Sequence, residues 1–269
     1  MMPQGISVIV GNGELPIKVL NNIKKSGIEV DVIGICNEYD RRVKSLCRRF
    51  REIKFYEIER GIEGLREFGN RDVIFVGGVR KSLMLDILRP DVMIKVLSLK
   101  STTDEDIFSS IIKRIESEGF SVLSFTRFYE EGLVREGVIC GETPDERLIS
   151  DADYGMRFIK HNTDFSTGQS VVVKDENILA VETVFGTDEM LRCLCGKGVK
   201  GAILVKASKH SQDLRVDLPS IGKRTVDLIL KCHIRWIFIE AERSIIIGDS
   251  ETIEYARKKG VNICGRRSG

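Results

Sequence analysis

The densest polar stretch of the chain directly follows four apolar residues, 202–205. Within twelve residues it places three cations, Lys206, Lys209 and Arg215, and the carboxylate of Asp217. Lysine and arginine neutralise the charge of a pyrophosphate, and an aspartate binds a divalent metal ion or takes a proton from water. The stretch therefore indicates phosphoryl-transfer chemistry. A solvated charged loop is the alternative that spacing alone leaves open.

A second candidate site follows the apolar residues 6–10, which have the pattern of a buried strand. Gly11, Asn12 and Gly13 come next, and Gly78 belongs to a similar turn after a later apolar run. Glycines let the backbone approach a ligand, and a helix N-terminus favours negative charge, so these turns suit a phosphate or a nucleotide. A tight turn without a ligand explains the glycines equally well. A nicotinamide site is a weaker alternative, because only two of the three fingerprint glycines are present.

Other motifs point to structure or exclude chemistry. Thr187 and Asp188 open a predicted helix, where a capping role is the usual one and a ligand contact is the alternative. Cys193 and Cys195 have no second pair at zinc spacing. The sequence contains no G-x-S-x-G elbow and no P-loop motif, which argues against an α/β-hydrolase and a P-loop NTPase.

The elements that must position these residues alternate between strand and helix patterns. In the first half we expect strands at 6–10, 30–35, 55–56, 73–76 and 120–125, helices at 16–23, 58–68, 82–99 and 104–118, and a charged amphipathic stretch at 38–50. In the second half we expect helices at 151–164, 221–231 and 250–259, a hairpin over 170–182, and strands at 202–205, 234–239, 244–247 and 261–264. This order predicts an α/β protein with an N-terminal Rossmann-like parallel sheet and a C-terminal α/β domain. We expect the domains at 1–130 and 151–269, with a charged, turn-rich linker at 131–150.

Composition narrows the partners and the compartment. The 269 residues carry a net charge of +2, which gives no electrostatic drive toward nucleic acid. Seven scattered cysteines, an opening without a secretory pattern and the lack of any apolar run near 20 residues lead us to expect a cytoplasmic protein with reduced thiols.

The polar stretch, read as residues 206–222, resembles the KAPKPxQxxRxDLPTIG segment of the LpxI family, the UDP-2,3-diacylglucosamine pyrophosphatases of lipid A biosynthesis. The likeness continues through the turn at 11–16, similar to the family's GGGxLP, through Gly168-Gln169, and through Glu182 and 186–191. It extends over essentially the whole chain. This sequence departs from the family's segments at Asn12, which stands in place of a glycine, and at Ser208 and His210, which stand in place of prolines.

The resemblance implies a Mg²⁺-dependent hydrolysis of UDP-2,3-diacylglucosamine to UMP and lipid X, which is 2,3-diacylglucosamine 1-phosphate. The family's essential aspartate falls on Asp217, as metal ligand or water-activating group. The substrate contacts that we expect are Gly11, Asn12, Gly13, Gly78, Gln169, Thr187, Asp188, Lys206, Lys209, Gln212 and Arg215. The enzyme would work at the inner face of the inner membrane, and assembly into a homo-oligomer is left open. The alternative function is non-catalytic binding of a nucleotide or nucleotide sugar.

Overall fold

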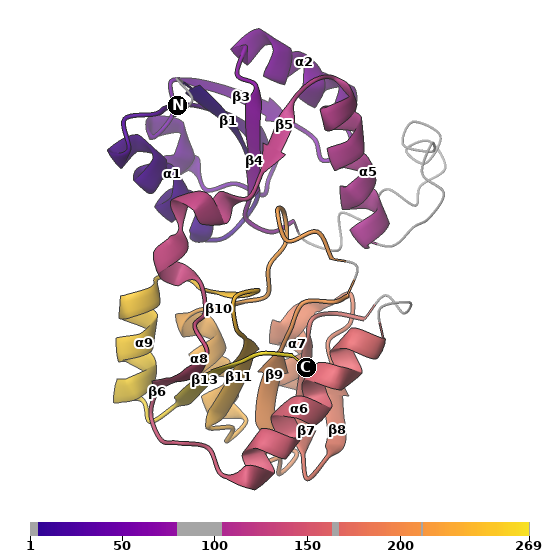
Figure 1. Ribbon diagram of the computed structural model, residues 1–269, viewed down its shortest axis with the longest axis vertical. Coiled ribbons are helices and arrows are strands. Elements are labelled where there is room, and N and C mark those ends of the chain that lie inside the picture. The colour runs from indigo at the N-terminus through magenta and orange to yellow at the C-terminus, as the bar shows by residue number, and fades with distance from the viewer. Residues whose placement is uncertain (1–4, 80–103, 163–166, 211, 269) are drawn as a thin grey trace. The chain divides into compact units, whose positions relative to one another are not determined.

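The computed structural model describes residues 5–79, 104–162, 167–210 and 212–268. The chain divides into two compact units (Figure 1). Unit 1 comprises Met1–Glu130 together with Asp213–Asp217, and unit 2 comprises Glu131–Gln212 together with Leu218–Gly269. The polar stretch is therefore divided between the two units, which its sequence did not reveal.

Unit 1 is built on a five-stranded sheet in the order β3-β2-β1-β4-β5, and all of its strands are parallel. Its elements are β1 (Gly5–Val10), α1 (Leu15–Lys25), β2 (Glu29–Ile35), η1 (Arg41–Ser45), β3 (Arg49–Ile53), α2 (Ile58–Phe68), β4 (Asp72–Val76), α5 (Asp104–Ser117), β5 (Ser121–Leu123) and η2 (Phe125–Phe128). The strand order reverses between β1 and β4, as in dinucleotide-binding folds. The predicted Rossmann-like sheet is confirmed.

The helices of unit 1 cover both faces of this sheet. Apolar side chains of α2 and α5 pack on one face against alternate strand residues such as Ile9, Ile33 and Phe75. Helix α1 contacts β2 and β4 and buries Val19, Leu20 and Ile23. The strand predicted at 55–56 is wrong: β3 lies earlier and begins at the end of the charged stretch, because an edge strand has one side open to water and tolerates charged side chains.

Unit 2 contains a six-stranded mixed sheet in the order β6-β13-β11-β9-β7-β8 and a two-stranded sheet of β10 and β12. Its elements are η3 (Glu130–Gly132), β6 (Gly137–Cys140), α6 (Glu146–His161), β7 (Ser170–Lys174), β8 (Asn177–Val181), α7 (Gly186–Leu194), β9 (Ile203–Lys206), β10 (Ser220–Ile221), α8 (Lys223–Lys231), β11 (Trp236–Glu240), β12 (Ile245–Ile246), α9 (Asp249–Lys258) and β13 (Asn262–Arg266). Strands β9, β11 and β13 are parallel, whereas β6, β7 and β8 run antiparallel to their neighbours. The prediction of a second α/β domain is confirmed.

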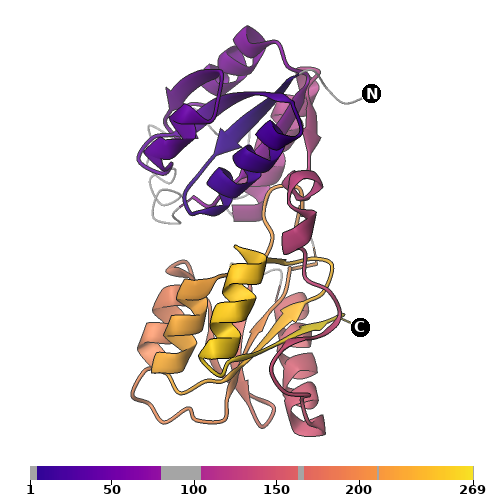
Figure 2. The same ribbon diagram turned by 90° about the vertical axis from the view of Figure 1, so that its left-hand side faces the viewer.

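Helices cover both faces of the larger sheet (Figure 2), and each face carries its own hydrophobic cluster. Helix α6 packs on one face, where Gly155 lets it approach closely: a Cβ there would lie 2.9 Å from a Val205 methyl. Helices α7, α8 and α9 pack on the other face. Successive strand residues point to opposite faces, as with Leu204 and Val205, which are both buried, and so supply the two clusters.

The segment expected as a linker carries structure in unit 2. Residues 131–150 include β6 and the first residues of α6, which begins at Glu146 rather than at 151 because Asp145 caps it: its Oδ1 accepts the Leu148 N–H at 2.8 Å. The helix expected at 82–99 lies outside the described residues. Within the described ranges, no helix is long and apolar enough to cross a membrane.

Candidate active site

The two glycine turns of unit 1 meet at the carboxyl edge of the parallel sheet, as predicted for strands β1 and β4. The Gly11 N–H donates to the Val76 carbonyl at 3.0 Å, and the Asn12 N–H donates to the Gly78 carbonyl at 2.7 Å. Gly78 returns a hydrogen bond from its N–H to the Asn12 carbonyl at 3.1 Å. These three N–H groups therefore hold the turns together and are not directed at a ligand.

The same contacts explain why glycine occupies these positions. A Cβ on Gly11 would lie 2.1 Å from the Gly78 carbonyl oxygen, closer than any real contact allows. Gly13 instead needs its positive φ of 97° and has open space around it. Asn12, which replaces a family glycine, donates from Nδ2 to the buried Glu38 carboxylate at 2.7 Å. The turn thus has structural reasons for its residues, and its role in substrate binding stays a prediction.

A buried polar cluster at one edge of the unit 2 sheet brings together three segments that are distant in sequence. Lys206 ends β9 and is only 7% exposed. Its Nζ donates to Thr187 Oγ1 at 2.9 Å, and the Thr187 hydroxyl donates to Glu182 Oε2 at 3.0 Å. The Gln169 N–H also donates to Glu182, at 3.2 Å. The expected contacts Lys206, Thr187 and Gln169 therefore share one cluster, and Glu182 joins them.

Asp188 lies outside this cluster. Its carboxylate forms an ion pair with Arg224 at 2.5 Å, and the Arg224 side chain is 71% exposed. An ion pair this accessible is a surface feature, so the structure gives Asp188 a partner other than a ligand.

The loop after β9 is closed by its own side chains. Gln212 is buried and accepts the Lys209 N–H through Oε1 at 3.0 Å. Lys209 is also buried, at 7% exposure. Gln212 therefore fixes the backbone that carries Lys209, a role that the sequence alone did not indicate.

Sequence reasoning missed Glu240, the last residue of β11 and only 1% exposed. Its Oε2 accepts the N–H and the hydroxyl of Ser208 at 2.7 and 2.6 Å, and its Oε1 accepts Lys160 Nζ and the Ser268 hydroxyl, both at 2.6 Å. Burial raises the pKa of Glu240, but the hydrogen bonds from Lys160, Ser208 and Ser268 outweigh it and hold that pKa below its ordinary value. Glu240 thus fixes Ser208, which lies between Ala207 and Lys209.

One sign of the hydrogen-bonded group around Glu240, which comprises Lys160, Ser208 and Ser268, was visible in the sequence. Ser208 stands where the family's segment has a proline, and a proline has no N–H to donate. A serine there offers two donors and needs a buried acceptor. Its acceptor lies 32 positions away in the chain, so only the fold identifies Glu240.

Arg215 anchors the part of the polar stretch that belongs to unit 1. Its guanidinium bonds both oxygens of Asp213, from Nε at 3.0 Å and from Nη2 at 2.8 Å, and it bonds Glu116 at 2.6 Å. The hydrogen bonds that Arg215 donates to Asp213 and Glu116 raise its pKa against the opposing effect of burial. Two carboxylates already hold this cation, so its predicted phosphate contact stays a prediction.

Asp217 ends the same segment and is exposed. Its N–H donates to the Asp213 carbonyl at 3.3 Å, which forms a turn over 213–217. Among the described residues, no group of three or more His, Cys, Asp or Glu side chains could hold a metal ion by itself.

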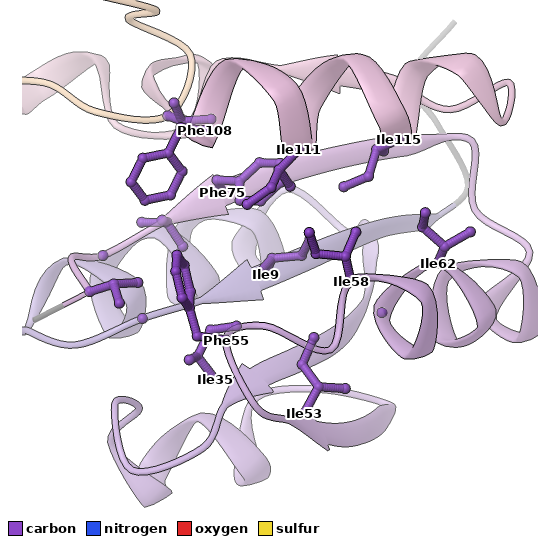
Figure 3. Close-up of a pocket in the computed structure, with 16 residues that line it drawn as sticks. Ile9, Ile35, Ile53, Phe55, Ile58, Ile62, Phe75, Phe108, Ile111 and Ile115 are labelled. Carbon is purple, nitrogen blue, oxygen red and sulfur yellow. The ribbon is translucent and has the colours of Figure 1, made fainter. Parts of the chain in front are cut away.

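An apolar pocket of about 630 Å³, its open mouth included, lies beside this segment in unit 1 (Figure 3). It lies between one face of the sheet and helices α2 and α5, and Val216 contributes to its wall. Figure 3 shows its side chains converging on a common space: Ile9, Ile35, Ile53, Phe55, Ile58, Ile62, Phe75, Phe108, Ile111 and Ile115. Every described residue that lines it is Gly, Val, Ile or Phe.

Comparison with family models matches both halves of the chain. The LpxI N-terminal domain matches residues 5–132, and the LpxI C-terminal domain matches residues 135–264. A curated protein, the UDP-2,3-diacylglucosamine pyrophosphatase LpxI of Caulobacter vibrioides, is 25% identical over 272 residues, which cover 97% of this chain and 96% of that protein.

Solved structures match more distantly. They include the biotin carboxylase domain of a Hydrogenobacter thermophilus 2-oxoglutarate carboxylase, with 13% identity and a TM-score of 0.27 over 72% of this chain and 40% of that one. An L-amino acid ligase of Bacillus licheniformis has 11% identity and a TM-score of 0.29 over 68% of this chain and 40% of that one. Scores this low carry no argument about function. The family models together span nearly the whole sequence, and the chain belongs to the LpxI family.

Proposed function

We propose that this protein hydrolyses the pyrophosphate bond of UDP-2,3-diacylglucosamine and releases UMP and 2,3-diacylglucosamine 1-phosphate. The observation that carries the proposal is the buried cluster of unit 2, in which Lys206, Thr187 and Gln169 come together from three segments that resemble the family. These three segments are distant in sequence, and the fold brings their polar groups into contact at one place. The pyrophosphatase name of the Caulobacter relative supports the same reaction.

The polar stretch supplies the groups that such a reaction needs. Two linked phosphates carry negative charge that must be neutralised before water attacks, and the ammonium groups of Lys206 and Lys209 do this in the proposal. Gln212 and Glu240 hold the loop backbone so that these cations are preorganised. Gly11, Asn12, Gly13, Gly78, Asp188 and Arg215 remain proposed substrate contacts.

Mg²⁺ is the proposed cofactor, with Asp217 as its ligand from the chain. This ion usually keeps several waters and binds through one or two carboxylates plus substrate phosphates, so a single accessible aspartate fits it. When bound, Mg²⁺ would stabilise the charge that develops on the phosphate oxygens. Asp217 itself would orient the ion or accept a proton from water.

The test is to incubate the full chain with UDP-2,3-diacylglucosamine and Mg²⁺ and to measure UMP by chromatography. We expect Asp217→Ala and Asp217→Asn to lower kcat by at least about 100-fold, because removal of a metal ligand or base costs on the order of 10²–10⁴. Glu63→Ala is the matched control, since Glu63 is another exposed acid of unit 1. Wild-type turnover by the Asp217 variants would overturn the proposed role.

The same assay separates catalysis from binding. UDP binding by calorimetry without release of UMP would indicate the non-catalytic nucleotide-sugar binding protein instead. Omission of Mg²⁺, with EDTA present, tests the cofactor: we expect turnover to stop and to return when Mg²⁺ is added in excess.

The proposed substrate also sets where the protein acts. A molecule with two acyl chains stays in a bilayer, so we propose that the protein works at the inner face of the inner membrane as a peripheral protein. Sedimentation with lipid vesicles tests this, and recovery of all protein in the supernatant, with and without substrate in the vesicles, would contradict it.

A further inference from the structure

We propose that a second pocket, in unit 2, binds a phosphate-bearing anion at a site separate from the proposed substrate contacts. This basic pocket has a volume of about 1010 Å³, its open mouth included, and it is lined by residues of helix α6 and by residues 266–268 at the end of β13. None of the proposed substrate contacts is among its described lining residues. Its charged and titratable lining residues are Arg157, Lys160, His161, Arg266, Arg267 and Asp153.

The sequence of α6 places one wall of the basic pocket on a single side of the helix. Ser150, Asp153, Arg157 and Lys160 follow one another at spacings of three or four residues, which align side chains along one face. Residues 266–268 supply the other wall, and they continue from a strand that has neighbours on both sides in the sheet. Both walls therefore belong to regular elements of unit 2.

The lining of the basic pocket carries an excess of positive charge. It contains four lysine and arginine side chains and one carboxylate, that of Asp153. Arg266 bonds both oxygens of Asp153, with Nη2 at 2.6 Å from Oδ2, so this carboxylate is already neutralised. Lys160 has Glu240 as its partner, but Glu240 is only 1% exposed and does not line the pocket. An anion in the pocket would therefore meet cations.

Arg157 and Arg267 are the cations most available to a ligand. Among the described residues Arg157 has no ion-pair partner, and its guanidinium lies 5.9 Å from the centroid of the Tyr154 ring. Arg267 pairs with Glu136 and Glu242, but all three side chains are more than half exposed. Ion pairs this accessible contribute little to stability, so a ligand can replace them at low cost.

These side chains select the class of ligand. A guanidinium presents paired N–H donors that match two oxygens of a phosphate, and Lys160 adds an ammonium group. Lys160 Nζ donates to Glu240 Oε1 at 2.6 Å and to Ser208 Oγ at 3.2 Å, so one of its three N–H groups remains for a ligand. The volume is at the upper end of the range for small-molecule pockets, roughly 300–1,000 Å³, so the ligand is larger than a single phosphate ion. A free pyrophosphate group and a phospholipid headgroup both meet this description.

The first experiment measures anion binding without catalysis. The full chain is titrated with inorganic pyrophosphate by calorimetry, in the presence of EDTA. We expect binding that weakens as NaCl is added, because salt screens exposed charges. Arg157→Ala and Arg267→Ala should each lower the affinity roughly tenfold, which corresponds to the loss of a hydrogen bond between charged groups. Both side chains are exposed, so the two variants should fold.

Three further variants locate the bound anion. Arg192→Ala is the matched control, because it removes the same charge from an exposed position of α7 outside the pocket, and it should bind as the wild type does. Arg157→Lys keeps the charge but not the paired donors, so its affinity should lie between those of the wild type and Arg157→Ala. Lys206→Gln alters the proposed substrate site and should leave the affinity unchanged. Loss of binding in Lys206→Gln, or wild-type affinity in both Arg157→Ala and Arg267→Ala, would overturn the inference.

The second experiment identifies the source of the phosphate. The full chain is sedimented with vesicles of phosphatidylcholine, with and without phosphatidylglycerol. Sedimentation that needs phosphatidylglycerol and is lost when Arg157 and Arg267 are both changed to Ala assigns a lipid headgroup to the basic pocket. Pyrophosphate binding without such sedimentation assigns a free anion. If neither is observed, the inference is wrong.

UMP release separates this inference from the proposed function. With UDP-2,3-diacylglucosamine dispersed in detergent, Arg157→Ala and Arg267→Ala should keep the KM and kcat of the wild type. A rise of about tenfold in KM in these variants would place the pocket in the substrate site and overturn the separate site. If the wild type releases no UMP, the proposed function fails, and the pyrophosphate titration still decides whether the pocket binds an anion.

Discussion

In each unit one of the described strands carries a fully buried carboxylate, and the two carboxylates lie at opposite ends of their strands. In unit 1, Asp31 lies near the start of β2 and accepts hydrogen bonds from Arg48, Arg49 and Asn70. In unit 2, Glu240 ends β11, at the edge where the loop after β9 also begins. Ligands of parallel α/β sheets bind at the carboxyl ends of the strands, so Glu240 lies at the edge where the proposed site is expected, whereas Asp31 lies at the opposite edge of its sheet.

The largest effect is expected from Glu240→Ala. Removal of one partner of a buried ion pair costs about 3–5 kcal/mol, and here Lys160, whose side chain is 15% exposed, would lose its partner. Urea denaturation measures this loss, and UMP release should fall with it because Ser208 loses its acceptor. Glu254→Ala removes an exposed acid paired with Lys258 and should leave the unfolding midpoint unchanged. A Glu240→Ala protein with normal stability would contradict the stabilising role given to Glu240.

A smaller loss of stability, with no loss of activity, is expected for Asp31→Ala. Arg48 and Arg49 are 44% and 39% exposed, so water can hydrate them when the carboxylate is removed. We expect about 1–3 kcal/mol from the hydrogen bonds lost. Reduced turnover in a folded Asp31→Ala protein would break the distinction between the two carboxylates.

The pH dependence of stability should follow the same carboxylates. The pKa of Glu240 is held below its ordinary value of 4.5, so the folded protein keeps this group ionised more readily than the unfolded chain does. Its contribution is therefore complete above about pH 5 and is lost as the pH falls through the folded pKa. The difference in unfolding free energy between wild type and Glu240→Gln should shrink below about pH 4.5 in denaturation curves. If the difference in unfolding free energy grows as the pH falls, the predicted direction of this pH dependence is wrong.

The smallest effect is expected from Ser268→Ala, which removes one donor to Glu240 and leaves the ion pair with Lys160 intact. One hydrogen bond contributes roughly 1 kcal/mol. A loss as large as that of Glu240→Ala would show that Ser268, rather than Lys160 and Ser208, holds the carboxylate in place.

Local pattern predicted the architecture well. Buried strands of β-branched residues, such as 6–10 and 202–205, and the glycine turns after them identified the parallel sheet of unit 1 and the second α/β layer. The pattern failed where an element faces water on one side. The charged edge strand β3 has no apolar run, and its pairing partner β2 is what makes it a strand.

The site was predictable only as far as single segments carry chemistry. Lys206 and Asp217 are conspicuous in their own stretch. Glu182 becomes significant through its partners at positions 169 and 187, and Glu240 through its partners at positions 160 and 208. For Arg215 the sequence predicted a partner that the structure replaces. Its charge suggested a phosphate contact, whereas in the structure it donates hydrogen bonds to Asp213 and Glu116. A side chain's partner across the fold cannot be read from its neighbours in the chain.

Because the polar stretch is divided between the two units, a truncated protein can lack part of unit 1. A fragment that stops at residue 130 would encode the five strands of unit 1 but omit Asp213–Asp217. Glu116 would then lack Arg215, and the wall that Val216 completes would be open, which leaves bare hydrocarbon of the kind that promotes aggregation. Residues 1–130 are therefore not a complete copy of unit 1, because the five residues that complete it come from much later in the polypeptide.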